Sequence, residues 1–192
     1  MEIHETHEKI EEAHHKNNKR AAILIIALAA LLAIVEMAGK EAEFQSIDRN
    51  IDRSDTYAFY QAKTIRSTLV RTVMEGAALL PREGAADEGA AREKQIADWQ
   101  ATIKRLDSDP ASGEGRKELL VRAKEITAER DHKLHAYHDY EYAAAALQLA
   151  IVMASAAVIT EVTLLELVSA GLGLAGLAMG LIGWLAPALL EL

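Results

Sequence analysis

Histidine and glutamate are concentrated in the first sixteen residues, MEIHETHEKIEEAHHK. On a helix, His7, Glu11 and either His14 or His15 fall along one face, and imidazole with carboxylate is a ligand set that Zn²⁺ accepts. The segment has no apolar stripe that could pack and fix the positions of these ligands. A metal site also needs neighbouring groups that orient its ligands. A solvated, partly helical tail with i,i+4 charge pairs is therefore favoured over a metal site. The candidate metal ligands are His4, His7, His14 and His15.

A second group of histidines recurs every three residues before the second apolar segment: His132, His135 and His138. Steps of three drift around a helix, so these imidazoles do not converge on one point. Tyrosines lie among them, and tyrosines suit the headgroup level of a membrane. Interfacial anchoring is favoured, with a pH-responsive collar as the alternative because histidine titrates near neutrality.

Three apolar segments are long enough to cross a bilayer: residues 21–38, 143–159 and 164–190. From residue 143 onwards there is no lysine or arginine. A polar tail, residues 1–20, precedes the first segment, and no small-x-small cleavage pattern follows it. We therefore expect an uncleaved signal anchor and three transmembrane helices.

The first two segments each carry one acid or amide, Glu36 in the first and Gln148 in the second. Both should lie at similar depth in the same leaflet. An acid inside a membrane helix is costly and usually faces protein, so Glu36 is expected to point at a neighbouring helix. An interhelical hydrogen bond or a snorkelling carboxylate is favoured. A proton or ion relay is the alternative.

The third segment carries small residues at steps of four and three: Ser169, Gly173, Gly176, Gly180 and Gly183. Small residues let helix backbones approach closely, which is a common basis of helix association in lipid. Part of this face must pack within one protomer, and we expect it also to favour an oligomer.

Residues 39–142 are charged and are predicted to form an extramembrane helical stalk. A helix over 39–80 is expected to carry one apolar stripe, with Ala58, Ala62 and Ile65 among its members. A short helix, 85–106, and a third helix, 116–142, follow the breaks at PREGAADEG and SDPASGEG. We expect an antiparallel, coiled-coil-like hairpin in which the stripe packs against the returning helix. In that register Tyr60 lies near Arg122.

One tract of the stalk, SDTYAFYQAKTIR, residues 54–66, gathers aromatic, amide and basic side chains: Tyr57, Tyr60, Gln61, Lys63 and Arg66. Tyrosine side chains suit the edge of a helix–helix interface, where the ring is buried and the hydroxyl is exposed to solvent. Packing is favoured, and a ligand or partner strip is the alternative.

This tract, with AIVEMAGK and NKR before it and the histidine-rich N-terminus, resembles a family of bacterial membrane proteins known as domain of unknown function 4337. That family often has Trp where this chain has Tyr57, followed by the Tyr-Gln-Ala-Lys of residues 60–63 and the downstream Arg66. The resemblance covers nearly the whole chain, including the closing pair of membrane helices. It implies a bacterial inner-membrane protein and brings no activity and no catalytic residues. It strengthens the hypothesis that the strip does more than pack.

Several functions are excluded or disfavoured by composition. A net charge of −8 argues against nucleic acid as a partner. The absence of cysteine removes disulfides and thiolate chemistry. No glycine-rich phosphate loop, metalloprotease histidine pair or nucleophile setting occurs, so no enzyme and no cofactor are predicted.

The sequence thus predicts an all-α membrane protein, a non-enzymatic homo-oligomeric scaffold with a projecting helical stalk. Its expected partners are membrane lipid, other copies of itself and a protein bound through the stalk. The alternatives are a small channel or transporter subunit, and a metal- or pH-sensing membrane protein. The basic residues before the first span, Lys16, Lys19 and Arg20, outnumber Lys40 after it. They favour a cytoplasmic N-terminus and a periplasmic stalk.

Overall fold

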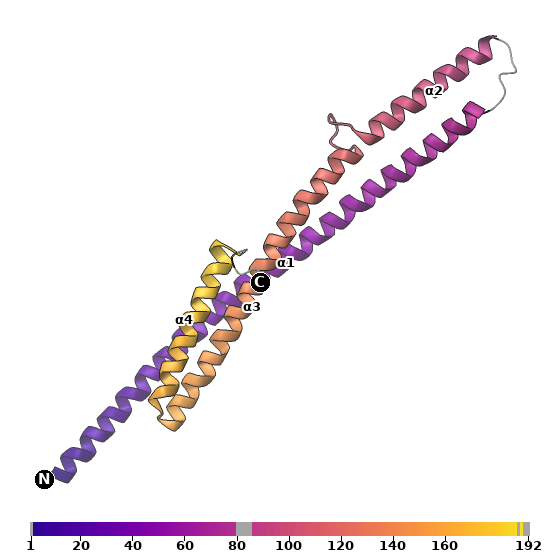
Figure 1. Cartoon of the computed structure of the whole chain (residues 1–192). Helices are drawn as coiled ribbons and strands as arrows, with labels where there is room; N and C mark the ends of the chain where they lie inside the picture. Colours follow the sequence, from indigo (N-terminus) through magenta and orange to yellow (C-terminus); the bar gives the residue numbers. More distant parts are fainter. Residues whose placement is uncertain (1, 80–85, 188, 190–192) are drawn as a thin grey trace. The chain divides into compact units, whose positions relative to one another are not determined.

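The computed structural model describes residues 2–79, 86–187 and 189, with side chains from Lys19 onwards except at residues 86–88. These residues form four helices and, within the described ranges, no strand (Figure 1). They are α1 (Glu2–Leu79), α2 (Ala86–Asp107), α3 (Arg116–Thr160) and α4 (Thr163–Leu185). The all-α prediction is confirmed. Three of the helices, α1, α3 and α4, contain stretches long and apolar enough to cross a membrane.

Both long helices run without a break from charged sequence into apolar sequence. α1 has 78 residues and continues through Gly39, while α3 has 45 residues and continues from the stalk region into the alanine-rich segment. A lone glycine weakens a helix by only about 1 kcal/mol relative to alanine, which the surrounding turns absorb. The predicted spans 21–38 and 143–159 are therefore parts of longer helices.

The chain divides into two compact units, Met1–Ser46 with Asp131–Leu192, and Ile47–Arg130. The first, here called the apolar unit, has a core made by α1 and α3: Leu28, Val35, Ala143, Leu147 and Ala150. α4 adds small buried residues to it, while large side chains such as Leu174 and Trp184 point outwards and are exposed. Small residues inside and large apolar residues outside are the arrangement that suits helices in lipid.

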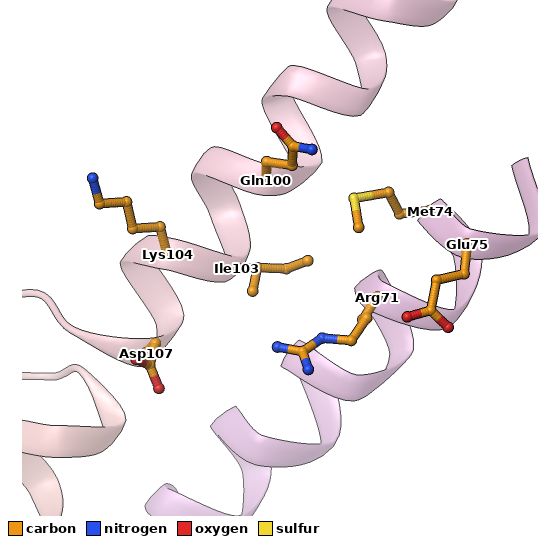
Figure 2. Close-up of a pocket in the computed structure, with 7 residues that line it drawn as sticks. All are labelled: Arg71, Met74, Glu75, Gln100, Ile103, Lys104 and Asp107. Carbon is orange, nitrogen blue, oxygen red and sulfur yellow. The ribbon is translucent and has the colours of Figure 1, made fainter. Parts of the chain in front are cut away.

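The second, here called the polar unit, holds residues 47–79 of α1, all of α2 and the start of α3. Ion pairs join Lys63 to Glu114 and Arg49 to Glu129, so α1 and α3 are antiparallel. α2 also lies along α1, and a hollow of about 530 Å³ remains between these two helices. Figure 2 shows Met74 of α1 and Ile103 of α2 pointing into it.

The face of α1 that packs inside the polar unit differs from the predicted one. The inward positions recur at alternating steps of four and three and are small or polar: Thr56, Tyr60, Lys63 and Ser67. The expectation that Ala58, Ala62 and Ile65 pack on the returning helix was wrong, because all three are exposed. The apolar side chains opposite α1 come instead from α3: Leu119, Ala123 and Ile126.

The helix register also differs from the predicted one, because the turn between α2 and α3 decides where α3 begins. Tyr60 meets Arg116 rather than Arg122. In the turn, the Glu118 carboxylate accepts hydrogen bonds from Ser108 Oγ at 2.7 Å and from the Asp109 N–H at 3.2 Å. The bond from Ser108 chiefly lowers the pKa of Glu118, so the turn is closed by a charged carboxylate at neutral pH.

Candidate functional site

The strip predicted from SDTYAFYQAKTIR divides into two sets of side chains. Tyr60 and Lys63 face the start of α3. The Arg116 guanidinium lies over the Tyr60 ring at 5.6 Å from its centroid, and Lys63 Nζ is 3.4 Å from Glu114 Oε2. Lys63 also lies 4.9 Å from the centroid of the Phe59 ring. These two residues therefore contact the start of α3 and the turn before it.

The other strip residues, Tyr57, Gln61 and Arg66, are exposed. At about 100° per residue, Tyr57 and Gln61 flank one edge of an apolar surface and Arg66 flanks the other. We call this surface the α1 stripe, and it consists of Ile47, Ile51, Ala58, Ala62, Ile65, Leu69 and Val73. The strip therefore borders an apolar surface that is exposed and that no described residue of the polar unit covers.

The α1 stripe is apolar enough to matter energetically. Ile65 is 69% exposed and Leu69 is 62% exposed. Burying one such side chain fully is worth about 1.5–3 kcal/mol. Several of them together reach the roughly 4–15 kcal/mol that association costs in lost freedom of motion. Ser54 and Asp55 interrupt this surface between Ile51 and Ala58. An exposed apolar surface of this kind typically marks an interaction site.

Glu36 and Gln148 lie within hydrogen-bonding distance of each other. Gln148 Nε2 donates to Glu36 Oε1 at 3.3 Å, linking α1 to α3 in the apolar unit. Both side chains are exposed, so this contact lies on the outside of the three-helix group. It can link two helices, but within one chain it does not line an enclosed passage.

The small residues of α4 face α1 and α3 of the same chain. Ser169 Oγ donates a hydrogen bond of 2.7 Å to the Ala150 carbonyl. A Cβ atom at Gly173 would lie 2.6 Å from Leu28 Cδ2, and one at Gly176 would lie 2.8 Å from Leu147 Cγ. A Cβ at Gly180 would meet Val35, and one at Gly183 would meet Asp139. This face is therefore occupied inside the protomer, and any contact between copies needs another surface.

The histidines form no metal centre in the described part of the chain. The side chains of His4, His7, His14 and His15 lie outside the described residues. Among the rest, no group of three or more histidine, aspartate or glutamate side chains is arranged to hold a metal ion. His138 Nδ1 lies 3.4 Å from Glu141 Oε2, which ties this imidazole to its own helix.

Asp139 is a residue that the sequence reasoning missed. Its side chain is only 4% exposed, faces Gly183 of α4, and has an Oδ2 atom without a hydrogen-bond partner among the described residues. Burial raises the pKa of this carboxyl above 3.8, and His135 and His138 partly oppose that effect. Its position four residues before Ala143 continues the buried face of α3, and that spacing is the signal that could have identified it.

The buried carboxyl should make stability depend on pH. Because its folded pKa is raised, the folded state holds the proton more tightly, so this carboxyl's contribution to stability is fully present below 3.8 and is lost as pH rises through the folded pKa. Asp139→Asn should remove this loss and raise the melting temperature at pH 7 by about 2–4 °C. Thermal unfolding in detergent between pH 3 and pH 7 measures it.

The exposed Asp98→Asn variant is the matched control, since it removes the same charge from the surface of α2. It should leave both the melting temperature and its pH dependence unchanged. A lower melting temperature for Asp139→Asn would mean that the ionised carboxylate stabilises the fold, contrary to this account.

A family model described as "Domain of unknown function (DUF4337)" matches residues 17–186. The match begins in the polar tail and ends after α4, so it covers the polar unit and most of the apolar unit. Comparison with curated proteins and with solved structures finds no match.

Proposed function

The chain belongs to the family of domain of unknown function 4337, and we propose that it is a non-enzymatic, homo-oligomeric scaffold of the bacterial inner membrane. Its membrane spans are residues 21–38, 143–159 and 164–190, and residues 39–142 form a helical stalk that projects from the bilayer. The N-terminus is cytoplasmic and the stalk periplasmic. Labelling of a cysteine at Ser112 by an impermeant reagent in intact cells tests that orientation.

Membrane insertion is supported by how side chains are distributed in the apolar unit. Its buried side chains are mainly alanine, glycine and serine, while isoleucine, leucine and tryptophan face outwards. In water this arrangement would expose a large apolar surface, whereas in lipid that surface is solvated and the small residues let the helices pack closely.

The single observation that carries the scaffold proposal is the exposed α1 stripe. Copies anchored in one membrane share one orientation, so their stalks run parallel and present the same residues at the same height. The α1 stripe of one copy therefore packs against the α1 stripe of a second copy, and a two-fold axis relates the two.

The spacing of the stripe supports pairing between nearly straight helices. Ile47, Ala58 and Leu69 recur every eleven residues, as do Ile51, Ala62 and Val73. An eleven-residue repeat corresponds to about 3.67 residues per turn, which is close to an undistorted helix and distinct from the seven-residue repeat of left-handed coiled coils. The inward face of α1, in contrast, follows steps of four and three.

Cysteine cross-linking tests this arrangement in the membrane, because the chain has no native cysteine. In the paired stripe, Ala58→Cys places two thiols opposite each other, and oxidation should convert most of the protein to a disulfide dimer. Such a bond requires Cβ atoms about 4 Å apart. Gel mobility without reductant measures it.

The matched control is Thr68→Cys, which is also exposed on α1 but lies about 90° from the centre of the stripe. It should stay monomeric on the gel under the same oxidation. Equal cross-linking at both positions would indicate random collision, and none at Ala58→Cys would contradict pairing through the stripe.

A second candidate, a channel or transporter subunit, is supported by the Glu36–Gln148 contact. Because this pair faces outwards from the apolar unit, an ion path would have to form between protomers rather than within one. Ion flux in liposomes, compared between the protein and its Glu36→Gln variant, separates a pore from a scaffold.

A further inference from the structure

A groove in the apolar unit, between α1 and α3, carries charged and aromatic side chains beside apolar ones. Its volume is about 290 Å³, and the residues that give it chemical character are Glu36, Lys40, Glu43, Tyr137, Tyr140 and Glu141. Gly39 brings the helices together here, since a Cβ atom at that position would lie 3.2 Å from Tyr140 Cβ. Neither the strip nor the α1 stripe takes part in this groove.

Two of its three carboxylates are oriented by hydrogen bonds. Tyr137 Oη donates to Glu141 Oε1 at 2.6 Å, and Gln148 donates to Glu36. The bond to Glu141 is the main cause that raises the pKa of Tyr137 to about 12, so the hydroxyl remains a donor at neutral pH. Among the described residues, neither Lys40 nor Glu43 makes an ion pair, which leaves both charges available to a ligand.

The charges favour a ligand with a cationic part and an anionic part. Three carboxylates outnumber one lysine, and tyrosine rings attract cations through their faces. A single metal ion does not fit this pattern, because no three acidic or histidine side chains in the described residues converge on one point. A primary ammonium group suits it better, since its N–H donors can bond to Glu43 and Glu141, which both lie close enough to Tyr137 to raise its pKa.

The groove also lies at the level where a lipid headgroup would be. The apolar span of α1 ends at residue 38 and that of α3 begins at residue 143, so the groove residues lie at the boundary between apolar and charged sequence. Tyrosines are enriched at this level in membrane proteins.

We propose that this groove binds the phosphoethanolamine headgroup of a membrane phospholipid. The ammonium lies between Glu43 and Glu141, and Lys40, which is nearer the apolar span of α1, binds the phosphate. Phosphatidylcholine should bind less well because its ammonium has no N–H to donate, and phosphatidylglycerol because it has no cation. The inference depends on membrane insertion but not on oligomerisation.

The experiment is native mass spectrometry of the full chain released from nanodiscs that hold all three lipids. We expect the wild-type protein to retain phosphatidylethanolamine in preference to the other two. Glu43→Gln combined with Glu141→Gln should reduce that retention by about three- to tenfold, which is the range expected for losing partly exposed ion pairs.

The matched control is Glu41→Gln, which removes a carboxylate on α1 about 200° around the helix from Glu43 and outside the groove. It should retain as much phosphatidylethanolamine as the wild-type protein. Equal retention of the three lipids, or no loss in the double variant, would overturn the proposal. If the protein binds free phosphoethanolamine as tightly as it binds phosphatidylethanolamine, the ligand is a soluble molecule and the lipid assignment is overturned.

The same spectra separate this proposal from the scaffold. Oligomers without bound phosphatidylethanolamine would contradict the headgroup site alone. Monomers that retain the lipid would contradict the scaffold alone.

Discussion

Gly176→Leu combined with Gly180→Leu should prevent the apolar unit from folding. A Cβ atom at Gly176 alone would lie 2.8 Å from Leu147 Cγ and 3.0 Å from the Ala143 carbonyl oxygen, and one at Gly180 would lie 3.3 Å from Val35 Cγ2. A leucine adds three more carbons to each overlap. Overpacking costs about 1–3 kcal/mol at each site, so the two together take much of the roughly 5–15 kcal/mol that stabilises a typical domain.

The measurements are the yield of membrane-inserted protein and its melting temperature in detergent. Gly171→Leu is the control, because it makes the same change on the same helix where a Cβ atom meets nothing within 4 Å. It should fold normally. A well-folded double variant that has only lost its partner copies would mean that these glycines join protomers, in conflict with the packing of α4 described above.

Ile65→Asp combined with Leu69→Asp should leave the chain folded but prevent copies of it from associating, which is the reverse of the effect expected for the glycine variant. Both side chains point away from α2 and α3, so neither substitution buries a charge within the chain. In a paired stripe, each copy would bring two carboxylates into an apolar contact. Breaking a desolvated contact in this way typically weakens association by several kcal/mol, or at least about a hundredfold in the dissociation constant.

Light scattering in mild detergent measures the mass, and circular dichroism measures the helix content. Thr68→Asp, exposed on the same turn of α1 but outside the stripe, should assemble as the wild-type protein does. Loss of helix content in the double variant, with normal assembly of whatever remains folded, would show that the stripe packs within the chain after all.

Much of the fold follows from the sequence because its signals are local. Helices are visible as long stretches free of proline, and the three apolar segments are identified by length and composition alone. The glycine face of α4 also follows, since a fixed rise and rotation per residue place each side chain along and around its helix.

Other features depend on which neighbour each helix face meets. Periodicity identified the α1 stripe, but it did not show that Thr56, Tyr60 and Lys63 are the residues turned towards α3. The returning helix was expected to cover the apolar face because burial is favourable. Here α3 supplies its own apolar residues, and the turn closed by Glu118 sets the register, so the stripe stays exposed.

The sequence by itself therefore determined the helices, their apolar segments and the residues that share each helix face, because these follow from backbone geometry and composition. Only the tertiary structure decided that the glycines of α4 are covered within the chain, that Asp139 is buried against Gly183, and that the α1 stripe is free. The physical reason is that a helix face is defined by neighbours in sequence, whereas its burial is defined by neighbours in space.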